Sequence, residues 1–179
     1  YSKKPYDAKA QFELMQSQEY FRVVWHESVV ENEKELLRNV PAGPEGMLPV
    51  VDEAKLTFAA GMSYPGPADY RFSKVFGGNG WDFFDQFGDS AESVAVRYSS
   101  HVTVRSIAWI GGYADFTQWD PREHAPDEDW QLLFELASSS SLDQPEVLWG
   151  DVGIGAFFIR PEDLRRQDFS RVLYTWDSH

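Results

Sequence analysis

The residues best placed to do chemistry lie in one strongly charged segment, Asp120 to Asp129. It carries five carboxylates and a single imidazole, His124. Carboxylate oxygens at this density are the ligands that a hard cation such as Ca²⁺ prefers. Their spacing matches no calcium loop, however, and the segment lacks the glycine on which the tight turn of such a loop depends. The sequence therefore predicts a solvated loop between strands and no metal site.

The other reactive residue types form no catalytic constellation. His26-Glu27 begins like the helical zinc-protease motif, but Val30 stands where the second histidine would be. The chain has no cysteine, which excludes disulfides, thiolate metal sites and a cysteine nucleophile. It also has neither a Gly-x-Ser-x-Gly elbow nor a phosphate loop ending in Gly-Lys-Ser/Thr. We expect no catalytic residue, no metal and no cofactor, and the sequence favours a protein that is not an enzyme.

Sugar chemistry is the one class that the composition leaves open. Seven Trp and eight Tyr side chains could line an aromatic cleft. Glycosidases also need two carboxylates about 5–9 Å apart, and the sequence does not show which of several aspartates would pair. Trp109, Trp130 and Trp149 lie among apolar residues, which favours packing in a core. The candidate aspartates are Asp82, Asp85, Asp115, Asp151 and Asp163.

The charge of the chain limits its partners. The 179 residues carry 16 Lys and Arg against 29 Asp and Glu, a net charge of −13. Nucleic acids and anionic membranes need a cationic face, so we expect neither as a partner. A basic protein is the partner that this charge favours. No apolar run approaches the ~18 residues of a membrane span, and no secretion signal is visible in the sequence.

The hydrophobic pattern predicts one domain with many short strands and a few short helices, an α+β protein built on antiparallel sheet. Helical turns are expected near the N-terminus, at Glu31 to Arg38, at Asp69 to Val75, at Trp81 to Phe87 and from Pro161 to Arg166. Alternating or continuous apolar residues predict the strands Phe21 to His26, Ala54 to Ala60, Val94 to Tyr98, Val102 to Ser106, Trp130 to Leu136, Gly153 to Ile159 and Phe169 to Trp176.

Several motifs occur in an order that resembles a known family. They are Asp69-Tyr70-Arg71-Phe72, Gly111-Gly112-Tyr113-Ala114-Asp115-Phe116, Asp120-Pro121-Arg122, Trp149-Gly150-Asp151 and Asp163-Leu164. Together, across Phe21 to His179, they resemble the YwqG-like family, a bacterial domain of unknown function. The resemblance implies a single α+β domain over residues 1–179 that lacks the family's N-terminal strands. It also implies a cytoplasmic protein, and the family's occurrence near toxin genes suggests an immunity role.

The motif positions supply the candidate binding residues. The structural interpretation of the same positions is that the glycines suit unusual dihedral angles and that Trp149-Gly150-Asp151 forms a turn. Asp151 could cap backbone amides or pair with Arg122. The candidates are Gly111, Gly112, Gln118, Asp120, Arg122, Trp149, Gly150, Asp151 and Asp163.

Three functions remain open at this stage. The first is an acidic protein-interaction domain that binds a basic protein, such as a toxin. The second is a small-molecule or carbohydrate-binding domain with a pocket of aromatic and aspartate side chains. The third is a structural accessory domain without a ligand.

Overall fold

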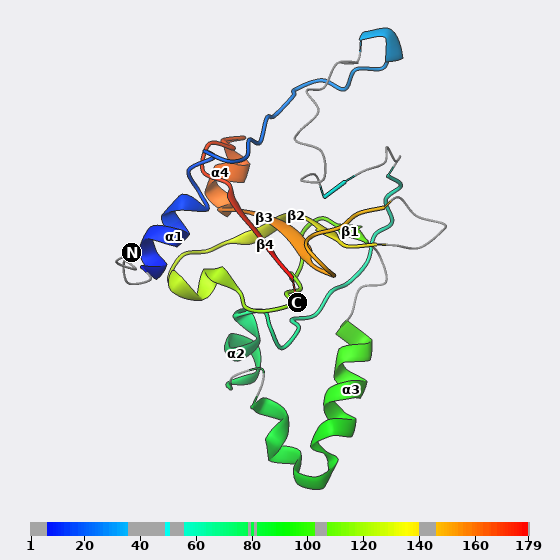
Figure 1. The fold of residues 1–179 in the computed structure, drawn as a ribbon, viewed down its shortest axis with the longest axis vertical. Coiled ribbons are helices and arrows are strands. Elements are labelled where there is room, and N and C mark those ends of the chain that lie inside the picture. The colour runs from blue at the N-terminus through cyan, green and yellow to red at the C-terminus, as the bar shows by residue number, and fades with distance from the viewer. Residues whose placement is uncertain are drawn as a thin grey trace.

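The computed structural model describes residues 7–35, 49–50, 56–78, 80, 82–102, 107–139 and 146–178. Its centre is a four-stranded antiparallel sheet in the order β1-β2-β3-β4 (Figure 1). The strands are β1 (Ala108–Trp109), β2 (Gln131–Ala137), β3 (Ile154–Ile159) and β4 (Leu173–Asp177). The α-helices are α1 (Ala8–Leu14), α2 (Arg71–Phe76), α3 (Ala91–Val102) and α4 (Pro161–Arg165), and the 3₁₀ helices are η1 (Glu33–Glu35), η2 (Phe83–Ser90) and η3 (Pro121–His124).

The sheet and α1 enclose the main core. Phe12 of α1 packs edge-on against Trp130, with ring centroids 6.2 Å apart. Trp130, Leu132 and Phe158 are buried at the centre of this core, which confirms that Trp130 serves packing. Asp7 starts α1 because its carboxylate accepts the Ala10 N–H at 3.1 Å. The expected α+β class and antiparallel sheet are therefore confirmed.

A bulge in β2 changes which side chains reach the core. The register between β2 and β3 shifts between Leu132 and Phe134. Because one extra residue reverses the alternation of the strand, Glu135 joins Leu132 on the buried side. The strand predicted over Trp130 to Leu136 is confirmed, but the bulge breaks the alternation of its apolar residues between the two faces.

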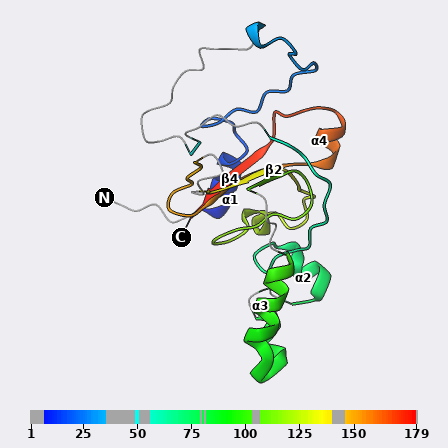
Figure 2. The same cartoon turned by 90° about the vertical axis from the view of Figure 1, so that its right-hand side faces the viewer.

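The helices α2, η2 and α3 form an arm, residues 71–102, that projects away from the sheet in both views (Figures 1 and 2). Gly88 breaks the helical path with φ 53° and lets the chain turn back at the tip. Aromatic rings hold the arm together: Phe72 contacts four of them at centroid distances of 4.7–6.2 Å, namely Phe76, Phe83, Phe84 and Tyr98.

Several predicted elements are confirmed. They include α2, η2, β3 and α4, at or near the expected residues. Helical structure at Glu31 to Arg38 is limited to η1 among the described residues. The final strand begins only at Leu173 because Ser170 and Arg171 form a turn.

Three predicted strands are wrong. Val94 to Tyr98 and Val102 belong to α3, because Val94, Tyr98 and Val102 recur at the helical spacing of four and Tyr98 packs on the arm's rings. Phe21 to His26 forms no regular secondary structure and joins no sheet. At the edge strand β4, the Tyr174 N–H donates instead to Met15 O at 2.9 Å. Residues 56–60 form no strand, and residues 54–55 and 103–106 lie outside the described residues.

Within the described ranges, no helix is both long and apolar enough to cross a lipid bilayer.

Candidate functional site

Two short motifs of the same form, Asp-x-Arg, contact each other at the base of the arm, where α2 begins. In each, the aspartate accepts the backbone N–H of the arginine two residues later, at 2.9 Å for Asp69 and 3.0 Å for Asp120. The same arginine then bends back and pairs with that carboxylate, at 2.7 Å for Arg71 and 2.6 Å for Arg122. Each motif therefore folds locally into a turn closed by its own ion pair.

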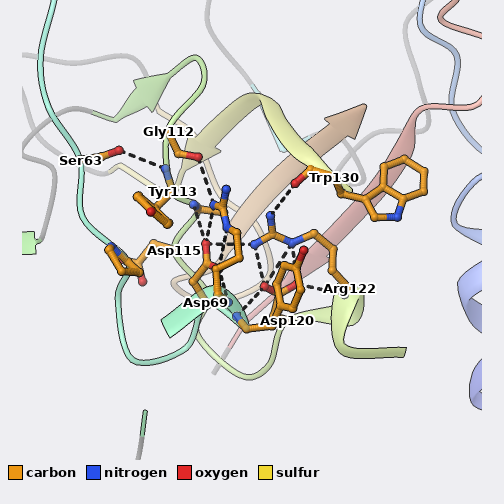
Figure 3. Close-up of polar contacts among 12 residues, drawn as sticks. Ser63, Asp69, Gly112, Tyr113, Asp115, Asp120, Arg122 and Trp130 are labelled. Atoms are coloured by element: carbon orange, nitrogen blue, oxygen red, sulfur yellow. Dashed lines mark hydrogen bonds and ion pairs between the residues drawn. The ribbon is translucent and has the colours of Figure 1, made fainter. Parts of the chain in front are cut away.

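Arg122 joins the two motifs (Figure 3). Its guanidinium also reaches Asp69 at 3.0 Å, and the Tyr70 N–H beside Asp69 donates to Asp120 at 3.0 Å. The side chains of Arg122, Asp69 and Asp120 are fully buried. The guanidinium lies 4.2 Å from the ring centre of Phe158, which places this network directly on the sheet core. We call Asp69, Arg71, Asp120 and Arg122 the ion-pair network.

The network is electrostatically self-contained. Burial alone would raise the pKa of Asp69, but the hydrogen bond from Arg71 and the charges of Arg122 and Arg71 outweigh it and hold the pKa below its ordinary value. Burial would lower the pKa of Arg122, but Asp120 and Asp69 raise it. Asp69 is therefore ionised, and both oxygens of Asp69 and of Asp120 already accept hydrogen bonds within the fold. Neither carboxylate has a free oxygen to offer a substrate.

A second buried group holds the loop at residues 115–118. Both carboxylate oxygens of Glu135 accept the Asp115 N–H at 3.2 Å, and Asp177 accepts the N–H groups of Thr117 and Gln118 at 3.0 and 2.9 Å. Burial and the nearby charges of Asp115 and Asp177 raise the pKa of Glu135 well above its ordinary value, although the Asp115 N–H and Arg122 act in the opposite direction. Burial likewise raises the pKa of Asp115. Glu135 is thus a buried carboxyl without a direct cationic partner among the described residues.

The structure does not bring the nine sequence candidates into one cavity. Asp120 and Arg122 lie in the ion-pair network, whereas Gly111 and Gly112 line a pocket of about 530 Å³ together with residues 57–63 and 108–110. The other four pockets in the described part of the chain contain none of the nine. Arg122 pairs with Asp120 and Asp69, whereas Asp151 lies in an exposed turn and does not contact it. The Asp120 to Asp129 segment, predicted as solvated, buries Asp120 and Arg122, because these two side chains neutralise each other inside the core.

The remaining candidates lie in three other places. Gly111 and Gly112 have φ of 71° and 74°, and a side chain at Gly112 would overlap Ser63. Gln118 donates to Asp177 through its backbone and to Ser178 O through its amide, near the turn that holds Trp149 and Gly150. Asp163 is buried in α4 and pairs with Arg171 at 2.6 Å. The predicted unusual dihedrals and the Trp149-Gly150-Asp151 turn are confirmed.

Sequence reasoning missed Asp69, Arg71 and Glu135 as members of a polar centre. The repeated Asp-x-Arg spacing was a usable signal for the first two, since the carboxylate of such a motif can reach both the backbone and the side chain of its arginine. Glu135 carried no signal, because only the bulge turns it inward. Within the described ranges, no cluster of three or more His, Asp and Glu side chains is arranged to hold a metal ion.

Comparison with protein families gives one finding. The family model of a domain of unknown function, DUF1963, matches residues 1–178. The chain belongs to the DUF1963 family. No curated protein matches it. Membership in DUF1963 fixes no activity, so the function must be argued from the chemistry of the surface.

Proposed function

We propose that this DUF1963 domain is a non-enzymatic protein-binding module that presents the tip of its arm to a basic protein. The observation that carries the proposal is the chemistry of the tip. Residues 77–96 contain four carboxylates and no Lys, Arg or His. Asp82, Asp85, Asp89 and Glu92 are all exposed.

An apolar anchor lies among these charges. Phe87 is 43% exposed between Asp85 and Asp89, and Val96 is 62% exposed further along α3. At protein interfaces an exposed aromatic side chain can enter a pocket of the partner, and charges near it steer the encounter. The partner that complements this tip has a basic surface around an apolar pocket.

The interior supports a binding role over catalysis. The two buried acidic groups whose pKa is shifted by contacts with the core, Asp69 and Glu135, hold the fold: Asp69 pairs with Arg71 and Arg122, and Glu135 accepts the Asp115 N–H. The same network anchors the arm. Tyr70 and Arg71 begin α2, and the Tyr70 N–H donates to Asp120 of the network. The buried charges therefore position the tip, and the tip meets the partner.

Finer features of the proposal come from the motif resemblance. We extend it to a single YwqG-like domain of the bacterial cytoplasm. An immunity-like role, in which the acidic tip neutralises a basic toxin, is the form of partner binding that this resemblance favours. A structural accessory domain without a ligand is the outcome if no partner is found.

The test is affinity purification of the tagged full-length protein from its host at low salt, followed by mass spectrometry. The tip variant Asp85→Asn/Asp89→Asn/Glu92→Gln is compared with Glu123→Gln/Asp127→Asn/Asp129→Asn, which removes the same number of exposed charges elsewhere. We expect a stoichiometric basic partner that leaves as salt rises, and about tenfold or greater loss of its affinity in the tip variant alone. Phe87→Ala should also weaken binding of the partner, and this loss of affinity should depend less on the salt concentration.

Two results would contradict the proposal. One is a partner that both charge variants retain equally, since binding would then lie away from the tip. The other is a protein that elutes alone at every salt concentration, which would favour the accessory role.

A further inference from the structure

A cleft next to the C-terminal end of α4 has the composition of a ligand site. It lies between residues 17–25 and residues 167–170 and has a volume of about 800 Å³, the largest of the pockets considered in the described region. This is large enough for a small molecule. The residues lining it are Ser17, Gln18, Arg22, Val23, Val24, Trp25, Gln167, Phe169 and Ser170.

One wall of this cleft is a flat aromatic surface. The rings of Trp25 and Phe169 stack with centroids 5.4 Å apart and planes inclined by 11°. Trp25 nevertheless remains 51% exposed. Stacking on Phe169 fixes the orientation of the indole while its other face stays open. A fixed and open indole face suits the apolar face of a sugar ring.

The polar groups divide into those that hold the cleft and those that a ligand could use. The Gln18 amide bridges the two sides, since it donates to Phe169 O and accepts the Val23 N–H at 3.1 Å. The Arg22 guanidinium and the Gln167 amide, by contrast, make no hydrogen bond to any described residue. Among the described residues that line the cleft, Arg22 is the one that carries a charge.

Backbone strain marks the same place. Gln18 and Gln167 are the two non-glycine residues with positive φ in the described chain, at 53° and 57°, and both line this cleft. Gln167 lies just after the C-terminus of α4. The Gln167 N–H donates to Leu164 O and the Asp168 N–H donates to Asp163 O, and these two bonds terminate the helix. Glycine or asparagine is favoured at such a position. The hydrogen bonds of the Gln18 side chain offset the cost of its positive φ. The Gln167 side chain makes no such hydrogen bond to a described residue, so the cost of its positive φ is not offset.

We propose that this cleft binds an acidic sugar, a uronic acid, with its ring on Trp25, its carboxylate on Arg22 and a hydroxyl on the Gln167 amide. A guanidinium matches a carboxylate in two parallel hydrogen bonds, which a neutral sugar cannot provide. The net charge of −13 disfavours a long polyanion, so the ligand is a single uronic acid or a short oligosaccharide that carries one. This site is separate from the arm and does not depend on the protein-binding proposal.

The test is ligand-observed NMR titration of the full chain with glucuronate and galacturonate, with glucose and galactose as neutral matched controls. We expect at least one acid to bind with a dissociation constant on the order of millimolar and at least about fivefold more tightly than its neutral counterpart. Arg22→Gln should abolish this preference. Arg165→Gln, which removes an exposed cation that does not line the cleft, should preserve it.

Gln167→Gly separates a binding role from a structural one. The substitution relieves the positive-φ backbone, so we expect a higher melting temperature together with a severalfold loss of acid binding. A higher melting temperature with unchanged binding would overturn the role of Gln167. No binding of either acid, or equal binding of acids and neutral sugars, would overturn the site. Failure here would leave the tip experiment unaffected, because the two sites share no residue.

Discussion

The ion-pair network and the arm use charge in opposite ways. In the network, Arg122 and two aspartates are removed from water and satisfy one another at 2.6–3.0 Å. At the tip of the arm, four carboxylates stay exposed without a cation in residues 77–96. Paired buried charges stabilise one structure, whereas unpaired exposed charges create an electrostatic field that attracts an oppositely charged partner. The first region builds the scaffold, and the second is the surface that we propose for partner binding.

The two regions also differ in what stabilises them. The network lies on a sheet core that includes Trp130 and Phe158. The arm depends on a small aromatic cluster around Phe72, and α3 contains no fully buried residue. We therefore expect the arm to open locally at a lower free energy than the sheet.

The largest effect should follow removal of Arg122. Arg122→Met leaves Asp69 and Asp120 buried without their shared cation, and we expect the free energy of unfolding to fall by about 3–5 kcal/mol. Urea denaturation measures this. Arg71→Gln should cost less, about 1–2 kcal/mol, because Asp69 keeps Arg122 and the Arg71 side chain is 21% exposed. A loss below about 1 kcal/mol for Arg122→Met would show that the network does not hold the core.

Truncation of the aromatic hub should break the arm selectively. Phe72→Ala removes a buried ring with four aromatic neighbours, at an expected cost of about 3 kcal/mol. Circular dichroism should show a loss of helix, while the fluorescence of the sheet core around Trp130 stays native. Val96→Ala, on the exposed side of α3, should change stability by less than about 0.5 kcal/mol. A single transition in which arm and sheet unfold together would contradict independent opening.

A smaller effect should appear in the pH dependence of stability. Since the pKa of Glu135 lies well above its ordinary 4.5, the folded state keeps a proton that the unfolded state releases. Stability should therefore fall as pH rises from about 4.5 through the folded pKa. Glu135→Gln removes this loss and should raise stability at pH 8 by on the order of 1 kcal/mol. The exposed control Asp127→Asn should leave the slope unchanged, and an unchanged slope in Glu135→Gln would show that Glu135 is ionised in the fold.

Asp69 acts in a separate pH window. Its lowered pKa contributes stability above the ordinary value of 3.8, which is lost as pH falls through the folded pKa. Acid unfolding and the loss of stability toward high pH therefore report on different carboxyls.

The sequence predicted the α+β class and most central elements because their hydrophobic patterns agree with their final structure, as in β3 and α2. It misassigned α3 because Val94, Val96 and Tyr98 alternate as in a strand, whereas Val94, Tyr98 and Val102 also fit the helical spacing of four, and the contact of Tyr98 with Phe72 decides for the helix. The motif positions Asp120 and Arg122 were recognised as candidates, but their burial depends on Asp69, fifty-one residues before Asp120 in the chain. A single bulge, invisible in the pattern, turned Glu135 inward.

Native-state hydrogen exchange of the free protein tests the contrast between scaffold and arm most directly. The amides of Tyr70, Ala114 and Arg122, which donate to buried carboxylates, should exchange only through global unfolding. The amides of α3 should exchange through local opening, at a free energy several kcal/mol lower. Equal protection in α3 and at these three amides would contradict the account, because the arm would then be as firmly built as the core.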